Sequence, residues 1–383
     1  MKTSKKVLII GQIPPIINGQ SLVTKSVLDI LVEAYYHVDF LPLTKLNHGN
    51  SFFLYFDKLK FYTRIIFKFL SKTISGNYII YLNGARSIGG TFRNFPILII
   101  SKILRNKTIL HFHCGDIDDF LNSRSRIIKF FLLLTYKLPD KLIILSPTLI
   151  KNFSQIKHKD NVVVIENGIN ISITKPKIIQ DSEQIKILYL SNLILSKGYF
   201  DILIAIDHLV NKLNFTNIEC NFCGEFLTSY DDPELNSIEK MKKDFHDYII
   251  QNNLGNHVNY KAQVLDGEKN KLLNENHILV LPTNYSTEAQ PLSIIEAISS
   301  GNVIISTNFR AIPDMVIDNY NGKFVPFGDP LSIAKNILYF INNPSEFNNY
   351  SKNSISIFQK SFTYDSFKYK ILTLFEQMSK SFK

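Results

Sequence analysis

Short apolar runs recur along the chain, and most are followed by a polar loop and then by apolar residues at helical spacing. The clearest runs lie at residues 7–10, 78–82, 108–112, 141–145, 162–165, 185–190, 218–223, 278–281 and 303–306. Runs of this length bounded by polar loops are typical of strands buried on both faces of a parallel sheet. Because such strands alternate with helices in both halves, the sequence predicts an α/β protein with two doubly wound domains.

The stretch Ile169–Gln184 separates the two series of strands. It has a mixed composition and contains Pro176, which suits a linker. We therefore expect a first domain at residues 1–170 and a second at residues 171–360. Apolar positions at helical spacing predict a final helix within residues 361–383.

Residues 278–301 combine several signals. The apolar run Ile278–Leu281 predicts a strand, residues 282–290 are a polar loop, and Pro291 suits the first position of a helix that ends near Gly301. A helix that begins just after a strand offers free N–H groups and a dipole that favour an anion such as phosphate. Glu288 lies in this loop and Glu296 lies in the helix, with seven residues between them.

Other polar positions follow predicted strands. Gly19 and Gly224 would let the backbone approach a ligand closely. His111 and His113 end a strand and precede Asp116, but a metal site would need a third ligand held in place. A pair of buried histidines without ligand contacts is the alternative. Cys220 and Cys223 have metal-like spacing without a second pair, so we interpret them as buried structural thiols.

Composition indicates a folded protein, since 45% of the 383 residues are hydrophobic and 20% are charged. The net charge of +10 is uneven: residues 1–175 hold 24 Lys/Arg and 10 Asp/Glu, whereas residues 176–383 hold 19 and 23. This asymmetry favours contact of the first half with an anionic membrane or with nucleic acid. No nucleic-acid-binding motif is present, which argues for no nucleic-acid partner. A merely basic surface is the alternative.

The basic, aromatic-rich stretch at residues 51–72 fits two interpretations equally well. It could lie in a membrane interface, or it could be a core helix with a solvated charged face. The longest apolar runs are far too short to span a bilayer, and residues 5–11 are interpreted as a first strand and not as a signal peptide. We therefore expect a cytoplasmic protein, with peripheral binding to the inner membrane face as an additional possibility.

The segment Glu288–Ala297 resembles the E-x7-E signature of family 4 glycosyltransferases. Besides the two glutamates it contains Pro291 and an apolar Leu-x-Ile-Ile sequence, and Ser-Ser-Gly follows at residues 299–301, while Gln290 replaces the usual aromatic residue or Gly. Lys197-Gly198 and the segment around His113 also match the family pattern. The alternative is an amphipathic helix that carries two solvated glutamates.

The resemblance implies a GT-B fold, in which two Rossmann-like domains face each other across a cleft. The first domain would bind the acceptor and the second the nucleotide-sugar donor, and the final helix would cross back to the first domain. The reaction would be a hexosyl transfer that retains anomeric configuration, without a metal or other cofactor. The donor would be a UDP- or GDP-sugar, and the acceptor a lipid-linked or surface-polysaccharide glycan.

The resemblance also implies site residues. His113 would face the donor sugar near its reacting carbon, Glu288 would accept hydrogen bonds from sugar hydroxyl groups, and Glu296 would bind the ribose. Asn192 stands where the family has a phosphate-binding Arg. The remaining expected donor-binding residues are Gly19, Lys197, Gly224, Gln290, Pro291, Leu292 and Ser293. Two other functions stay open: a nucleotide-sugar epimerase or hydrolase of the same fold, and a non-catalytic protein that binds polyanions or membranes.

Overall fold

The structure is a computed structural model that describes residues 5–14, 19–43, 52–156, 161–180, 183–229, 231, 237–264 and 266–382, with only the backbone described at 52–59 and 266. Residues 15–18, which belong to the expected loop before Gly19, lie outside the described residues, as do Ser51 and the side chains of residues 52–59. The chain divides into two compact units. Unit 1 comprises Met1–Gly168 and Tyr364–Lys383, and unit 2 comprises Ile169–Thr363.

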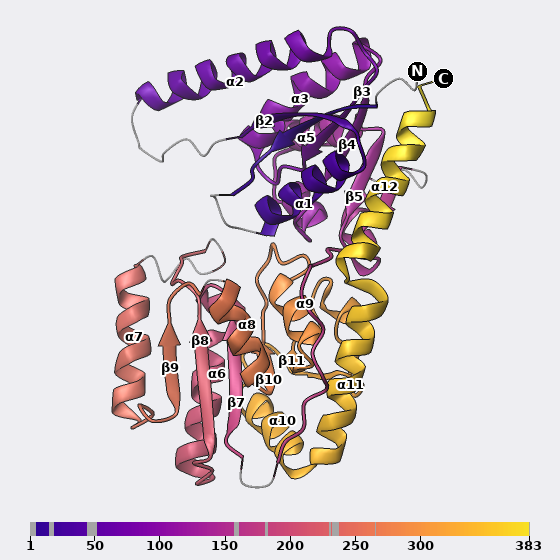
Figure 1. The fold of residues 1–383 in the computed structure, drawn as a ribbon. Coiled ribbons are helices and arrows are strands. Elements are labelled where there is room, and N and C mark those ends of the chain that lie inside the picture. The colour runs from indigo at the N-terminus through magenta and orange to yellow at the C-terminus, as the bar shows by residue number, and fades with distance from the viewer. Residues whose placement is uncertain are drawn as a thin grey trace. The chain divides into compact units, whose positions relative to one another are not determined.

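Unit 1 is built on a six-stranded parallel sheet with the order β2-β1-β3-β4-β5-β6 (Figure 1). The strands are β1 (Lys6–Gly11), β2 (His37–Pro42), β3 (Tyr78–Asn83), β4 (Lys107–His111), β5 (Lys141–Ile144) and β6 (Val162–Val164). The α-helices are α1 (Gly19–Glu33), α2 (Phe52–Thr73), α3 (Ile88–Ile103), α4 (Ile117–Asn122), α5 (Arg126–Tyr136) and α12 (Tyr364–Lys380).

Helices cover both faces of the unit 1 sheet. Helices α1 and α12 contact each other, and their buried residues share one hydrophobic cluster with Val7 and Ile9 of β1 (Figure 1). Leu8 and Ile10 point to the opposite face and are also fully buried. On that side α2, α3 and α5 contact one another in turn. This arrangement explains why the strands are apolar without alternation.

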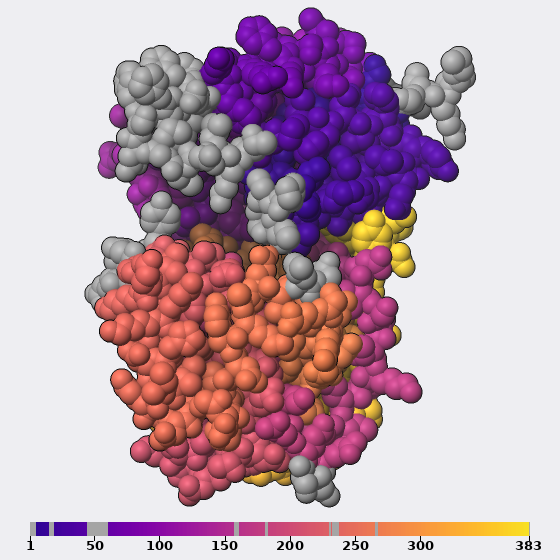
Figure 2. Space-filling view, turned by 60° about the vertical axis from the view of Figure 1, so that its left-hand side comes forward, coloured from indigo at the N-terminus to yellow at the C-terminus, as the bar shows by residue number. Residues whose placement is uncertain are grey.

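Unit 2 contains a second six-stranded parallel sheet with the order β12-β11-β10-β7-β8-β9. The strands are β7 (Ile185–Leu190), β8 (Ile218–Cys223), β9 (Val258–Lys261), β10 (Ile278–Leu281), β11 (Val303–Ser306) and β12 (Gly322–Phe324). The α-helices are α6 (Tyr199–Asp207), α7 (Ile238–Gln251), α8 (Asp266–Glu275), α9 (Leu292–Ser299), α10 (Pro330–Asn342) and α11 (Pro344–Ser361). In the space-filling view, the near side of this unit is formed mainly by the salmon and orange segments, which include α7 and α8 (Figure 2).

The strand order of unit 2 reverses direction between β7 and β10. Counted within the unit, the order is 3-2-1-4-5-6, in which the first and fourth strands are neighbours. The loops that leave these two strands at their carboxyl ends diverge to opposite faces of the sheet and leave room for a ligand between them. The topology therefore points to the loop after Leu190 and the loop after Leu281 as the natural binding position in this unit.

Helix α9 begins one residue later than the sequence predicts. Pro291 is the N-cap residue, because its ψ of 117° is extended, and the helix starts at Leu292. The predicted end at Gly301 is confirmed. Gly301 has a φ of +69°, its N–H bonds to the carbonyl of Ile298, and the N–H of Asn302 bonds to that of Ala297. This pair of bonds is a Schellman motif, and the left-handed conformation it needs favours glycine.

Two further features bear on the sequence analysis. Cys220 and Cys223 are fully buried in β8, as expected of structural thiols. In α2, Ile65, Phe69 and Thr73 form a buried stripe, so this part of the helix packs on the core. Along the part of the chain that the structure describes, no helix combines the length and the apolar character needed to cross a bilayer.

Candidate active site

The candidate donor site in unit 2 lies where the loops after β7 and β10 meet. The two strands are paired in parallel, so Ser191 and Pro282 follow them at the same edge of the sheet. The backbone N–H of Asn284 donates to the carbonyl of Ser196 at 2.7 Å, which joins the loops directly. A rigid connection of this kind holds the polar side chains of both loops in one place.

Gly198 allows the two loops to approach each other. It follows the short 3₁₀-helix Leu195–Lys197 and has a φ of +75°. A Cβ atom at this position would lie 2.5 Å from the carbonyl oxygen of Pro282, which is too close for two non-bonded atoms. Both the left-handed conformation and the close contact therefore require glycine. The consequence is that Lys197, the preceding residue, is directed at the β10 loop.

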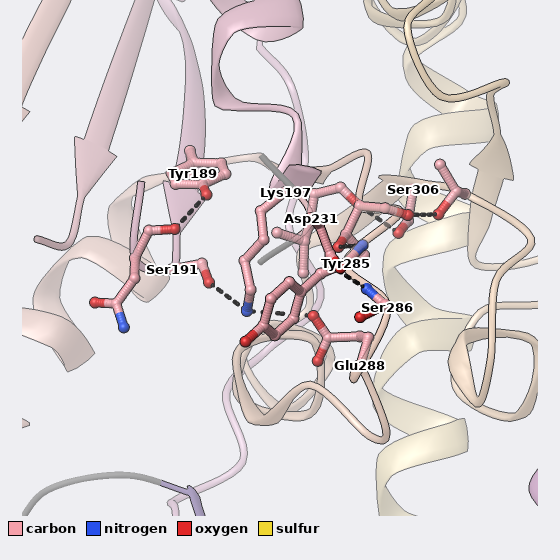
Figure 3. A network of polar contacts seen from close by, with 12 residues as sticks. Tyr189, Ser191, Lys197, Asp231, Tyr285, Ser286, Glu288 and Ser306 are labelled. Carbon is pink, nitrogen blue, oxygen red and sulfur yellow. Dashed lines mark hydrogen bonds and ion pairs between the residues drawn. The ribbon is translucent and has the colours of Figure 1, made fainter. Parts of the chain in front are cut away.

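Lys197 is held between side chains of both loops (Figure 3). Its Nζ lies 3.2 Å from a carboxylate oxygen of Glu288 and donates to the hydroxyl oxygen of Ser191 at 3.1 Å. The ammonium group also lies 5.1 Å from the ring centroid of Tyr285. Lys197 and Glu288 have side chains only 15% and 9% exposed, so their charges interact with little screening by water.

The loop that carries Glu288 is fixed at several points. The N–H of Ser286 donates to a carboxylate oxygen of Asp231 at 2.8 Å (Figure 3). The hydroxyl of Thr307 donates to the carbonyl of Thr283 at 2.5 Å. Ala289 and Gln290 are both about 5% exposed. The loop is therefore an ordered part of the unit and enters α9 in a defined direction.

The N-terminus of α9 follows this loop directly. Pro291 provides no side-chain cap, and the first N–H groups of a helix, here those of Leu292 and Ser293, have no acceptor within the helix. These N–H groups and the helix dipole favour a negatively charged partner. With the ammonium group of Lys197 near the same loop, this end of the sheet is suited to a phosphate-bearing ligand.

Glu296 lies farther along α9 and forms a second ion pair. Its carboxylate accepts a hydrogen bond from Nζ of Lys269 on α8 at 2.8 Å, and the two side chains are 11% and 21% exposed. The sequence analysis did not single out Lys269, because no motif marks a lysine in the polar helix α8. The pairing orients the carboxylate of Glu296 and leaves a partly exposed acid next to a basic group.

Gly224 and Asn192 meet at the end of β8. Gly224 has a φ of +146°, and a Cβ there would lie 2.0 Å from the carbonyl oxygen of Ser191. Close packing against the neighbouring backbone therefore requires glycine at position 224, whether or not a ligand also approaches it. Asn192 is exposed, and its carbonyl accepts a hydrogen bond from the hydroxyl of Tyr189 at 2.8 Å.

His113 lies in unit 1, just beyond β4, and belongs to a buried polar group. Its ring centroid is 4.2 Å from that of His111, whose Nδ1 is 2.7 Å from the hydroxyl of Tyr81. Burial raises the pKa of Tyr81 well above its usual value, so the hydroxyl that shares this hydrogen bond stays protonated. Burial lowers the pKa of His113 to about 3, and its Nε2 is buried without a hydrogen-bond partner among the residues that the structure describes.

The loop after His113 contains an acid that is paired with an arginine. Asp116 is 1% exposed, and one of its carboxylate oxygens lies 2.6 Å from both Nε and an Nη atom of Arg86. Gly19, the expected phosphate-loop glycine of this unit, is exposed at the first position of α1. No group of three metal-ligating side chains occurs among the residues that the structure describes.

The sequence-predicted site residues thus form two groups. Lys197 and Glu288 make direct contact, and Gln290, Pro291, Leu292 and Ser293 continue from the same loop. His113 and Gly19 belong to unit 1 and are described with that unit. Sequence reasoning missed Lys269, Tyr285 and Tyr81. None of the three carried a signal of its own, since even Tyr81 shares its strand with Tyr78 and Asn83.

Comparisons with known proteins agree with this architecture. Residues 170–356 match the family described as glycosyl transferases group 1. An uncharacterized glycosyltransferase of Methanocaldococcus jannaschii is 23% identical over 289 residues, which cover 74% of this chain and 74% of the relative.

Solved structures show the same fold at low sequence identity. HepE of Anabaena in complex with UDP has a TM-score of 0.72 and 14% identity, with 97% of this chain and 100% of that chain covered. HepE has also been solved with UDP-glucose. Sucrose-phosphate synthase of Thermosynechococcus elongatus has a TM-score of 0.75 and 15% identity, with 98% and 100% covered. The chain therefore has the GT-B fold of these structures, and its residues 170–356 match a glycosyltransferase group 1 domain.

Proposed function

We propose that this glycosyltransferase moves a hexosyl group from a UDP- or GDP-sugar to a hydroxyl group of a lipid-linked or surface-polysaccharide acceptor, with retention of anomeric configuration. The observation that carries the proposal is the position of Lys197, fixed by Ser191 and Glu288 at the switch point of the unit 2 sheet. The HepE structures, which contain UDP and UDP-glucose, favour a uridine donor over a guanosine donor.

The transfer reaction makes one main electrostatic demand, because the bond from the anomeric carbon to the diphosphate breaks and leaves negative charge on the phosphate. Lys197 and the N–H groups at the start of α9 would stabilise that charge. In the absence of ligand, Glu288 balances the ammonium group at 3.2 Å. With the donor bound, the same carboxylate would accept hydrogen bonds from hydroxyl groups of the sugar.

The roles of Glu296 and His113 are inferred from the chemistry of their side chains and belong to the same proposal. Glu296, oriented by Lys269, would accept hydrogen bonds from the ribose diol. His113 would contact the donor sugar as a neutral imidazole, since its lowered pKa excludes the charged form near neutral pH. The chemistry needs no divalent cation, because Lys197 and the helix N-terminus supply the positive charge. We place the enzyme in the cytoplasm, at the inner face of the membrane where a lipid-linked acceptor would lie.

Donor binding can be tested by the thermal stability of the purified protein with UDP-glucose, GDP-mannose, ADP-glucose and CMP-sialic acid in EDTA. A ligand that binds only the folded protein raises its melting temperature. We expect UDP-glucose to give the largest shift and Glu296→Gln to remove most of it. Glu275→Gln, in an exposed ion pair on α8, is the matched control and should leave the shift unchanged. No shift with any nucleotide-sugar would contradict the proposal.

A further inference from the structure

Helix α5 of unit 1 exposes an unusually apolar face. Ile127, Phe130 and Leu134 are 84%, 71% and 43% exposed. They lie three and four residues apart and therefore form one stripe along the helix. The opposite side of α5 packs on the unit through the buried residues Leu132 and Tyr136. A helix that buries one apolar side and exposes another has a surface that the unit itself does not use.

The apolar face continues onto helix α3, which contacts α5. Phe92 of α3 is 57% exposed, and its ring stacks on Phe131 of α5 with the centroids 4.3 Å apart. Phe131 also contacts Phe95 at 5.0 Å. These aromatic contacts join the two helices into one surface, which we call the α3–α5 face and define by Phe92, Ile127, Phe130, Phe131 and Leu134.

Helices α3 and α5, which form this face, carry Lys and Arg but no Asp or Glu, whereas Asp118 and Asp119 lie on α4, which also contacts α5. Between residues 58 and 115 the sequence has ten Lys/Arg and no Asp/Glu, and between residues 123 and 139 it has four Lys/Arg and no Asp/Glu. On α5, Arg126 precedes the apolar stripe, and Lys137 follows it as the C-cap residue. Both are exposed. A helical surface that combines exposed aromatic and aliphatic residues with cations matches the interface of an anionic bilayer.

We propose that the α3–α5 face docks unit 1 on an anionic lipid bilayer, with Phe130 and Ile127 inserted among the acyl chains and Arg126 and Lys137 at the headgroups. This inference deepens the proposed function, because it names the surface that would bring the enzyme to a lipid-linked acceptor. It differs from the sequence analysis, which weighed the stretch at residues 51–72 for that role.

Two other partners fit the face less well. A second copy related by a twofold axis would bring the cations beside its own α3–α5 face close to those of this one, and like charges would oppose the contact. Nucleic acid would satisfy the cations but would leave Ile127 and Leu134 exposed to water, since aliphatic side chains gain little from a phosphate backbone. A bilayer satisfies both the charges and the apolar side chains.

The test is co-sedimentation of the full chain with large vesicles of phosphatidylcholine containing 30% phosphatidylglycerol, compared with pure phosphatidylcholine, without any nucleotide-sugar. We expect binding to the anionic vesicles, and we expect Phe130→Asp to weaken it at least about tenfold. The control is Ile250→Asp on α7 of unit 2, because Ile250 is 72% exposed and thus as accessible as Phe130. This control should bind like the native chain.

A second variant tests the electrostatic part. Arg126→Glu combined with Lys137→Glu should lower binding to anionic vesicles and leave circular dichroism and melting temperature unchanged. The proposal is overturned if the native chain does not pellet with anionic vesicles, if Phe130→Asp and Ile250→Asp bind equally, or if a short RNA duplex displaces the vesicles. Because the assay contains no donor, its result is independent of whether unit 2 binds a nucleotide-sugar.

Discussion

At the scale of single residues, the most constrained position near the candidate site is Gly224. It has a φ of +146°, and any Cβ would clash with the carbonyl of Ser191 at 2.0 Å. Gly224→Ala should therefore lower the free energy of unfolding by about 2–3 kcal/mol, since the new methyl group meets backbone that must shift. Urea denaturation measures this change.

Gly255 provides the matched control for this prediction. No atom lies within 4 Å of the Cβ that an alanine would add there, and its φ is not in the left-handed region. Gly255→Ala should change the free energy of unfolding by less than about 0.5 kcal/mol. If both variants were equally stable, close packing against Ser191 would not explain the glycine at position 224.

His113 allows a prediction about protonation. Burial lowers the pKa of its imidazole to about 3, well below the ordinary value of 6.5. The side chain should therefore remain neutral between pH 5 and pH 8, and its ring resonances in an NMR titration should not move in that range. A midpoint near 6.5 for His113 would show that its surroundings are wetter than the structure indicates.

At the scale of elements, Lys177 connects the segment before β7 to the end of α8. Its Nζ donates to the carbonyl oxygens of Leu273 and Asn276, which lie at the C-terminus of that helix. Burial lowers the pKa of Lys177 to about 7 from the ordinary 10.5. Between pH 7 and pH 10.5 Lys177 is mostly neutral in the folded chain and mostly charged in the unfolded chain, so the unfolded chain binds more protons.

The sign of the pH effect follows from this difference. The contribution of Lys177 to the free energy of unfolding should rise as pH increases from about 7 to about 10, because folding no longer requires burial of a charge. The measurement is urea denaturation of the native chain and of Lys177→Met across that range. The native chain should gain stability relative to the variant as pH rises, and a constant difference would contradict the lowered pKa.

The sequence predicted the main elements because each of them follows from local pattern. The apolar runs at 278–281 and 303–306 became β10 and β11, and Gly301 ended α9 in the left-handed conformation that few other residues adopt. The start of α9 was wrong by one residue. Pro291 fixes φ but not ψ, and the loop before it keeps ψ extended.

The contacts within the site were less predictable, because they join residues far apart in the chain. The pair of Glu296 with Lys269 and the contact of Lys197 with Ser191 and Glu288 depend on the strand order, which places β7 beside β10. Hydrophobic periodicity contains no information on that order. The resemblance of the E-x7-E segment pointed to the loops in which Lys197 and Glu288 make contact, but the partners of its residues came only from the three-dimensional structure.

At the scale of the whole molecule, the two units have different proposed roles, donor binding in unit 2 and membrane binding in unit 1. Unit 2 holds the loops proposed to bind the donor phosphates, while α3 and α5, which carry cations and no Asp or Glu, belong to unit 1. This division accounts for the uneven charge of the chain, because a donor site needs only a few cations in fixed positions, whereas a membrane-binding surface needs many. It also predicts that donor binding and vesicle binding are separable by mutation.

Metal independence of the whole enzyme is a further consequence of the proposed function. The proposed mechanism stabilises the leaving diphosphate with Lys197 and the α9 N-terminus. Slow hydrolysis of UDP-glucose by the purified chain, followed by UDP release, should therefore continue in EDTA at a rate within about twofold of that in Mg²⁺. Loss of activity in EDTA that Mg²⁺ restores would require a cation that the proposal omits.

The most direct test of the central claim is isothermal titration calorimetry of the native chain and of Lys197→Met with UDP and with UMP. The two nucleotides differ by the second phosphate, which Lys197 is proposed to bind. We expect the native chain to prefer UDP, and Lys197→Met to weaken UDP binding by about 10- to 100-fold while UMP binding changes little. Equal binding of UDP to both proteins, or no binding of UDP to the native chain, would contradict the account.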